Sequence, residues 1–229
     1  MYSATAGPAP PWPKLDEANA RHLPDDELRL LWLPSEQPGT EAIPRRERLD
    51  ALLRGALAPV LGLPPGELRF DREHKGRPFL RHERAPDFNL SDTTGGTLLA
   101  MTRAARVGVD LELRERAPPA ARLAARYFDP LESLALAQLP AAAAAREFIL
   151  LWTAKEASCK ATGTGIFGFL PRWCFEPGHE QPQLRALPAE AGEARRWRFL
   201  RVAPSPAHTA VLALRDAAPA LRLRAFSLG

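Results

Sequence analysis

Apolar residues recur along the first half of the chain in two different periods, which predict where its strands and helices lie. A short apolar run at residues 28–33 is typical of a strand, and residues 45–61 place their aliphatic side chains on one side of a helix. The glycine and prolines at 62–65 end that helix. Two further apolar runs, 97–102 and 107–113, have a short connection and predict an antiparallel hairpin.

Beyond a pair of prolines at 118–119 the pattern becomes helical. Helices are predicted at 120–127, at 130–138 and from about 141 to 161. The remaining residues are typical of strands at 173–176, 197–202, 209–214 and 221–226. Helices and antiparallel strands in both halves predict the α+β class. The expected division is an irregular Pro-rich lead-in at 1–24, one half at 25–117 and a second half at 118–229.

The composition is that of an ordinary globular protein. Of the 229 residues, 45% are hydrophobic and 25% are charged. No stretch approaches the ~20 continuous apolar residues of a membrane helix, and the N-terminus lacks the pattern of a secretory signal, so a cytoplasmic location is expected. Cys159 and Cys174 form no C-x-x-C pair, so we expect neither a zinc site nor a disulfide framework, and both should be buried.

The charge balance favours an anionic ligand or an acidic partner. The formal net charge is +4, from 31 basic and 27 acidic residues. A nucleic-acid-binding domain is an alternative with little support, because no dense run of Lys and Arg appears and no aromatic residues interleave one. Only four of the basic residues are lysines, and Lys75, Lys155 and Lys160 lie in the motifs described next.

One strand pattern places two carboxylates side by side. Apolar and polar positions alternate at 107–113, so Asp110 and Glu112 project from the same face, about 7 Å apart at ~3.3 Å per residue. Neighbouring carboxylates repel each other unless a cation lies between them, and Mg²⁺ prefers such oxygen ligands. Gly108 on this face is expected to leave room for a bulky ligand. The alternative is the solvated face of an amphipathic strand, balanced by the arginines that follow.

A second pattern lies on the long helix. Trp152, Glu156 and Lys160 recur at every fourth position and form one stripe, with Lys155 beside it. A Glu and a Lys in one stripe can act as a metal ligand or base next to a phosphate-facing cation. The alternative is an ordinary ion pair on an exposed helix face, worth ~0.2–0.5 kcal/mol.

Two turns complete the set of motifs. The Lys-Gly-Arg-Pro turn at 75–78 presents two cations, and residues 88–96 run from a strand end into a Gly-rich turn with hydroxyl groups and backbone donors. The four motifs follow one another along the chain: the basic turn, the Gly-rich turn, the acidic strand and the helix with a third carboxylate. Their order and spacing resemble the 4′-phosphopantetheinyl transferases of the surfactin-synthetase-activating type, in the subgroup with a W-x-x-K-E-A helix. The resemblance begins near residue 28 and extends to the end of the sequence, and its specific part is 75–165.

The resemblance implies a fold, a reaction and partners. Members of the family are pseudo-dimers of two similar α+β halves, with coenzyme A in the cleft between the halves. They transfer 4′-phosphopantetheine from coenzyme A to a serine of an acyl or peptidyl carrier protein and release 3′,5′-adenosine bisphosphate, with Mg²⁺ as cofactor. The subgroup tends to serve secondary metabolite biosynthesis, and we expect a monomer that binds neither nucleic acid nor a membrane. The alternative is a non-catalytic descendant that binds coenzyme A or a carrier protein.

The resemblance also implies roles for individual residues. Asp110, Glu112 and Glu156 are expected to hold Mg²⁺, and Glu156 to accept the proton of the carrier serine. Lys160 is expected to neutralise the α-phosphate, and Glu132 is a second candidate for proton transfer. The residues expected to bind coenzyme A are Lys75, Arg77, Pro78, Ser91, Asp92, Thr93, Asp110, Lys155 and Lys160.

Asp92 departs from the family pattern, which has S-H-[ST] with the His on the 3′-phosphate, because a carboxylate there would repel phosphate. Three outcomes are open. Asp92 pairs with an arginine of the preceding helix, the 3′-phosphate is held differently, or discrimination against dephospho-coenzyme A is relaxed. The candidate arginines are Arg45, Arg46, Arg48 and Arg54.

A carrier helix is expected to dock on an apolar patch just beyond the long helix. The candidates for this patch are Ile166, Phe167 and Phe169. The alternative for these three side chains is ordinary core packing.

Overall fold

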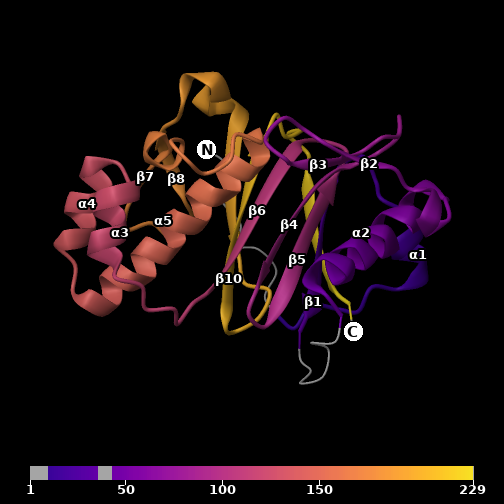
Figure 1. Ribbon diagram of the computed structural model, residues 1–229, viewed down its shortest axis with the longest axis horizontal. Coiled ribbons are helices and arrows are strands. Elements are labelled where there is room, and N and C mark those ends of the chain that lie inside the picture. Colours follow the sequence, from indigo (N-terminus) through magenta and orange to yellow (C-terminus); the bar gives the residue numbers. More distant parts are fainter. Residues whose placement is uncertain (1–9, 36–42, 229) are drawn as a thin grey trace.

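The computed structural model describes residues 10–35 and 43–228, which form a mixed α+β fold with two central sheets (Figure 1). The four-stranded sheet has the order β11-β1-β5-β4, and the three-stranded sheet the order β6-β10-β9. The strands of the first are β1 (Glu27–Pro34), β4 (Asp87–Thr93), β5 (Gly96–Thr102) and β11 (Arg222–Ser227). The strands of the second are β6 (Arg106–Leu113), β9 (Trp197–Val202) and β10 (His208–Arg215).

Two small hairpins lie outside these sheets. One pairs β2 (Phe70–Arg72) with β3 (Pro78–Leu80), and the other pairs β7 (Cys174–Glu176) with β8 (Gln183–Ala186). Short 3-10 helices are η2 (Pro65–Glu67), η3 (Leu170–Arg172), η4 (Ala189–Ala191) and η5 (Ala194–Arg196).

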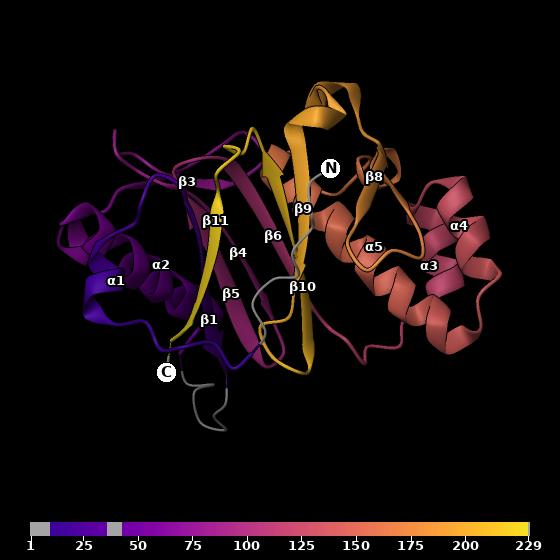
Figure 2. The same ribbon diagram turned by 180° about the vertical axis from the view of Figure 1, so that it is seen from behind.

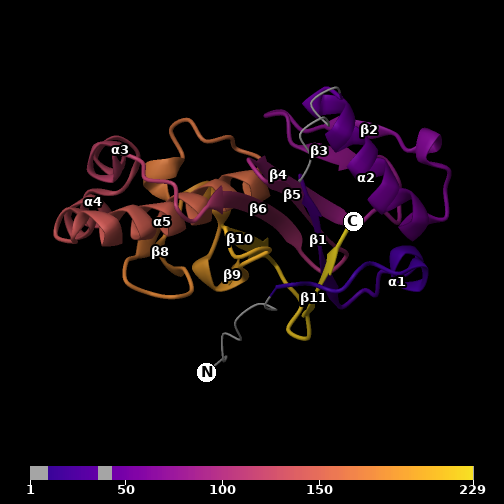
Figure 3. The same ribbon diagram turned by 90° about the horizontal axis from the view of Figure 1, so that it is seen from below.

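The helices flank the sheets on both sides, as the view from below shows (Figure 3). They are α1 (Glu17–Arg21), α2 (Arg45–Leu61), α3 (Ala120–Tyr127), α4 (Pro130–Ala137) and α5 (Ala141–Thr162). Helix α2 covers the four-stranded sheet, and α5 packs on β6 and β10 of the other. The opposite faces of the two sheets share a third core, to which β6 contributes Val107, Val109 and Leu111.

The predicted helices agree closely with the structure. Helix α2 has the predicted bounds, and α5 ends where Gly163 takes the left-handed conformation that favours glycine. Cys159 and Cys174 are both buried, as predicted. The lead-in is not irregular throughout, because Asp16 accepts a hydrogen bond from the backbone of Asn19 and so caps the short helix α1. Residues 1–9 of the lead-in lie outside the described residues.

The predicted hairpin of β5 and β6 is wrong. Strand β5 pairs with β4 and β1, whereas β6 pairs with β10. Every residue of β5 is buried, so this strand occupies a central position with a neighbour on each side. The short connection therefore takes the chain from one sheet to the other.

The sheets do not follow the proposed boundary near residue 118. The last strand, β11, lies parallel to β1 (Figure 2), and β6 from the first half pairs with β10 from the second. The division into halves and the pseudo-dimer stay predictions. Across the two described stretches of the chain, none of the helices has both the length and the apolar character that a membrane span requires.

Candidate active site

The centre of the site is a three-way contact between Lys160, Asp110 and Ser91, which come from α5, β6 and β4. The Nζ atom of Lys160 lies 2.7 Å from Oδ1 of Asp110 and 2.9 Å from Oγ of Ser91. Ser91 donates its own hydrogen bond of 3.0 Å to the same Asp110 oxygen. The structure thus brings together three predicted site residues that lie far apart in the sequence.

The other two predicted metal ligands act on the same cluster through their charges. Burial raises the pKa of Glu112, and Asp110 adds to this, although a hydrogen bond of 2.8 Å from Arg116 opposes it. Burial also raises the pKa of Glu156 to about 7, with further increases from Asp110 and Glu112, and Lys160 opposes the shift. The carboxylates of Asp110, Glu112 and Glu156 therefore repel one another, and the charge of Lys160 offsets part of this repulsion.

The chemistry of this donor set fits a hard divalent cation. The second carboxylate oxygen of Asp110, Oδ2, is buried and has no hydrogen-bond partner among the described residues. A buried carboxylate oxygen without a partner is costly, and a bound cation would satisfy it. As the described side chains stand, no three His, Cys, Asp or Glu residues are placed to hold a metal ion, so the magnesium site stays a prediction.

Gly108 makes room for a helix and not for a ligand, contrary to the prediction. A Cβ atom on Gly108 would lie 2.1 Å from the carbonyl oxygen of Ala157 and 2.4 Å from the backbone nitrogen of Ala161. Helix α5 therefore lies directly against the backbone of β6. This close approach brings the helix that carries Glu156 and Lys160 to the strand that carries Asp110.

Side chains of β4 replace a backbone ladder where the two sheets meet. In the described part of the chain no ladder joins β4 to β6. Instead, Asp87 accepts a hydrogen bond of 2.8 Å from the backbone nitrogen of Val107, and Asn89 accepts one of 2.9 Å from that of Val109. Ser91 continues this series by its bond to the acidic strand. Sequence reasoning missed Asp87 and Asn89, although polar residues at alternate strand positions were the available signal.

Arg77 points into the protein from the basic turn. Its buried guanidinium forms two hydrogen bonds to Asp87, of 3.1 and 2.7 Å. It also donates to the carbonyl oxygens of Phe88 at 3.2 Å, Val107 at 2.9 Å and Lys160 at 3.0 Å. Most of its donors therefore bind protein oxygens, although Arg77 also lines the cleft described below.

Asp92 pairs with arginines of α2, which is the first of the three outcomes considered. Its carboxylate accepts hydrogen bonds from Nε of Arg45 at 2.6 Å, from Arg48 at 3.2 Å and from the hydroxyl of Thr97. Burial raises the pKa of Asp92, but these hydrogen bonds and cations outweigh it and lower the pKa below its usual value. Thr93, half-buried, ends β4 beside it.

Glu132 and Lys155 form a buried ion pair. Their charged atoms lie 2.6 Å apart, and both side chains are almost completely buried. Glu132 also accepts backbone hydrogen bonds from Phe175 at 2.8 Å and Asp129 at 3.0 Å. Burial raises the pKa of Glu132 and lowers that of Lys155, and each partner opposes the shift of the other. These contacts are those of a structural pair, and they do not favour the roles predicted for the two residues.

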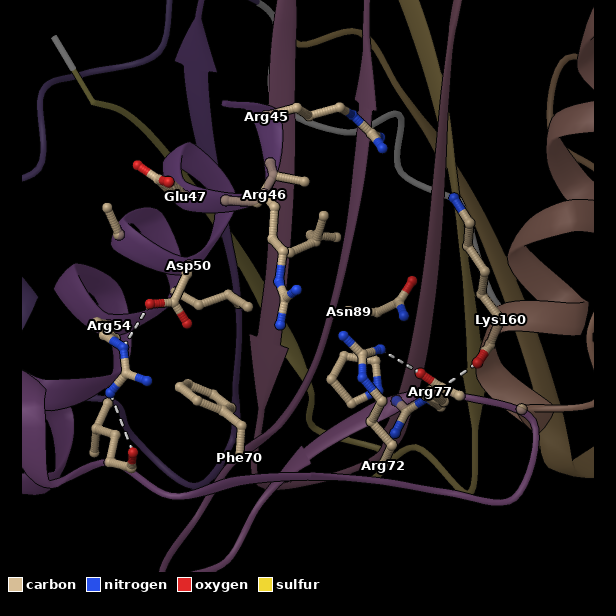
Figure 4. Close-up of a pocket in the computed structure, with 18 of the residues that line it drawn as sticks. Arg45, Arg46, Glu47, Asp50, Arg54, Phe70, Arg72, Arg77, Asn89 and Lys160 are labelled. Carbon is tan, nitrogen blue, oxygen red and sulfur yellow. Dashed lines mark hydrogen bonds and ion pairs between the residues drawn. The ribbon is translucent and has the colours of Figure 1, made fainter. Parts of the chain in front are cut away.

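A wide cleft of about 1700 Å³ opens beside the cluster, between α2, the β2–β3 hairpin and the end of α5 (Figure 4). Lys75, Pro78 and Lys160 are among the predicted residues that line it. The cleft carries an excess of positive charge, since only Glu47 and Asp50 are acidic among the described residues that line it. Its basic residues are Arg45, Arg46, Arg54, Arg69, Arg72, Lys75, Arg77 and Lys160.

The three candidates for a carrier-docking patch have different environments. Phe167 is 88% exposed, whereas Ile166 and Phe169 pack partly against the core of the helical region. Ile166 also lines the cleft. Only Phe167 offers the apolar exposure that docking would need.

Comparison with known proteins finds a family match for the part of the chain that carries β6 and α5. Residues 106–214, which include β6, α5 and β10, match the model of the 4′-phosphopantetheinyl transferase superfamily. The chain is 38% identical over 118 residues to the 4′-phosphopantetheinyl transferase HetI of Nostoc sp., covering 50% of each protein. It is 33% identical over 117 residues to the 4′-phosphopantetheinyl transferase psf-1 of Bacillus pumilus, covering 51% of this chain and 49% of the relative. The chain thus spans about half the length of these relatives, and the match at residues 106–214 places that part of the chain in the 4′-phosphopantetheinyl transferase superfamily.

Proposed function

We propose that this chain transfers 4′-phosphopantetheine from coenzyme A to the serine hydroxyl of an apo acyl or peptidyl carrier protein. The observation that carries the proposal is the contact of Lys160 with Asp110 and Ser91 at the edge of a cationic cleft. Coenzyme A carries a pyrophosphate and a 3′-phosphate, which a cleft with excess positive charge attracts. A lysine placed beside carboxylates at one end of this cleft suits chemistry at a phosphate.

In the proposed reaction, the serine oxygen forms a bond to the phosphorus that bears the pantetheine arm. The bond from that phosphorus to the bridging oxygen breaks, and 3′,5′-adenosine bisphosphate leaves. The hydroxyl proton passes to Glu156, directly or through water. A carboxylate within hydrogen-bond reach of the hydroxyl can accept its proton as a general base. Lys160 steadies the negative charge of the leaving phosphate.

Asp110, Glu112 and Glu156 would hold Mg²⁺ in this proposal. The ion would supply Lewis-acid polarisation of the phosphoryl oxygens when bound. The partnerless Oδ2 atom of Asp110 and the mutual repulsion of the three carboxylates support this assignment. Asp92, the departure from the family pattern, pairs with Arg45 and therefore does not favour the non-catalytic alternative.

The test is a transfer assay on intact carrier proteins. The chain is incubated with coenzyme A, Mg²⁺ and either an apo acyl carrier protein or an apo peptidyl carrier domain, and the carrier is weighed by mass spectrometry. We expect the carrier to gain one phosphopantetheine group, and this gain to vanish without coenzyme A or in the Asp110→Asn variant. Binding of coenzyme A with no transfer to either carrier would overturn the proposal in favour of a non-catalytic binding protein.

A further inference from the structure

The C-terminal end of α5 is held by two arginines from outside the helix. Arg77 donates from Nε to the carbonyl oxygen of Lys160 at 3.0 Å, and Arg106 donates from Nε to the carbonyl oxygen of Ala161. The last carbonyl groups of a helix lack partners within the helix, and cations are favourable at this end. Both carbonyl groups belong to the turn that carries the Lys160 side chain into the site.

Arg77 is itself fixed by two strands. Its side chain is only 4% exposed, and the guanidinium makes a two-bond contact with Asp87 of β4. It also reaches the carbonyl oxygen of Val107 on β6. The planar guanidinium can address several acceptors in fixed directions at once, which a lysine ammonium cannot reproduce. One side chain thus ties β4, β6 and the end of α5 together.

Arg106 is anchored through the same basic turn. It pairs with both carboxylate oxygens of Glu73, at 2.8 and 2.6 Å, and the backbone nitrogen of Glu73 donates to the carbonyl oxygen of Arg77 at 2.9 Å. A Cβ atom on Gly163, which ends α5, would lie 2.6 Å from Glu73. The turn between β2 and β3 therefore closes directly onto the end of the helix.

We propose that Arg77 is a positioning residue that acts through Lys160, with Arg106 in the same role at Ala161. By holding the backbone of Lys160, Arg77 sets the place from which Nζ reaches Asp110 and Ser91. This role differs from the ligand contact expected for Arg77 from the sequence. The expected effect of Arg77 on catalysis rests on the proposed function. The contacts of Arg77 and Arg106 with the last turn of α5, called the clamp below, are a property of the fold.

The kinetic test uses Arg77→Lys, which keeps the positive charge and replaces the planar guanidinium by an ammonium group. We expect kcat to fall about tenfold or more and the KM for coenzyme A to change less than about twofold, since a displaced Lys160 is felt mainly in the transition state. The matched control is Arg81→Lys just after β3, which makes the same substitution in an exposed ion pair with Asp71 and should leave both constants unchanged. A rise in KM with unchanged kcat would instead assign Arg77 to ligand binding and overturn the proposal.

A second measurement does not depend on the reaction. Hydrogen–deuterium exchange of peptides from the last turn of α5 should accelerate in Arg77→Lys, while peptides from β10 keep the exchange of the unaltered protein. Unchanged exchange at the helix end would overturn the clamp. If Arg77→Lys does not fold, Arg106→Lys, whose side chain is partly exposed, is expected to show the same two changes at smaller size. If the wild-type chain shows no transfer activity, the proposed function is wrong. The exchange experiment would still test whether Arg77 holds the end of α5.

Discussion

The ammonium of Lys160 lies 2.7 Å from Oδ1 of Asp110, although 50 residues separate the two in the sequence. This ion pair joins the long helix to the acidic strand at the edge of the cationic cleft. It compensates one oxygen of a buried carboxylate and leaves the other without a described partner. Both the charge of the site and its capacity for a cation therefore depend on this contact.

Replacing Lys160 tests whether this contact supports transfer. Lys160→Met should lower kcat/KM by about 10²–10³-fold, because a preorganised cation near the developing charge is lost. Steady-state kinetics with mass-spectrometric detection of the carrier measures the loss. Lys14→Met, at an exposed lysine in the lead-in, is the control. A loss below tenfold in Lys160→Met would show that the cation is dispensable.

Asp92 is expected to weaken the binding of coenzyme A by occupying two arginines. Asp92→His and Asp92→Asn should both tighten binding, up to about fivefold at low salt, since Arg45 and Arg48 become available to phosphate. Isothermal titration calorimetry measures the change. Asp26→Asn removes a carboxylate that pairs with Arg222, neither of which lines the cleft, and should leave affinity unchanged. Equal or weaker binding in both Asp92 variants would contradict the prediction.

Gly108 should be intolerant of any side chain. Gly108→Ala places a methyl group against the backbone of α5, so we expect a loss of about 1–3 kcal/mol in the free energy of unfolding. Urea denaturation measures it. Gly55→Ala is the matched control, because Gly55 lies inside α2 with open space around it and should gain about 0.5–1 kcal/mol. If both variants have the same stability, the close packing of α5 on β6 is not required.

The pair of Glu132 and Lys155 should matter for stability and not for chemistry. Glu132→Gln or Lys155→Met alone should cost about 3–5 kcal/mol of unfolding free energy, because each leaves an uncompensated buried charge. The double variant should recover much of this loss. The kcat of the folded double variant should stay within about threefold of the wild-type value. A large loss of kcat would instead support a role of Glu132 in proton transfer.

The raised pKa of Glu156 predicts a pH dependence of stability in protein kept free of metal by a chelator. The folded-state pKa of about 7 lies above the unfolded value of 4.5, so the folded state binds more protons between these values. The stability contributed by the protonated group is fully present below pH 4.5 and is lost as the pH rises through 7. The difference between 4.5 and about 7 corresponds to up to about 3 kcal/mol at pH 8, at ~1.36 kcal/mol per pH unit. Glu156→Gln should therefore melt above wild type at pH 8, by up to roughly 6–12 °C in a chain of this size. The gap should shrink at pH 5, as followed by scanning calorimetry, and a gap independent of pH would contradict the assignment.

Much of the local structure and the family followed from the sequence alone. The 3.6-residue period and the glycine and proline stops predicted α2 and α5 closely, because these signals act over a few residues. The alternation at 107–113 correctly placed Val107, Val109 and Leu111 in the core. The order of the motifs predicted the superfamily without any knowledge of the contacts between residues, and the family match at residues 106–214 agrees with this prediction.

Only the tertiary structure decided strand pairing and the partners of the polar residues. Strand β5 took β4 and β1 as neighbours, and β11 joined β1 from the far end of the chain, because pairing depends on contacts between distant segments. Arg77 and Lys75 lie in the same basic turn, and a sequence motif does not state whether a cation faces a cleft or a helix end. Burial and partnership are properties of the assembled chain, and they differ between the exposed Lys75 and the buried Arg77.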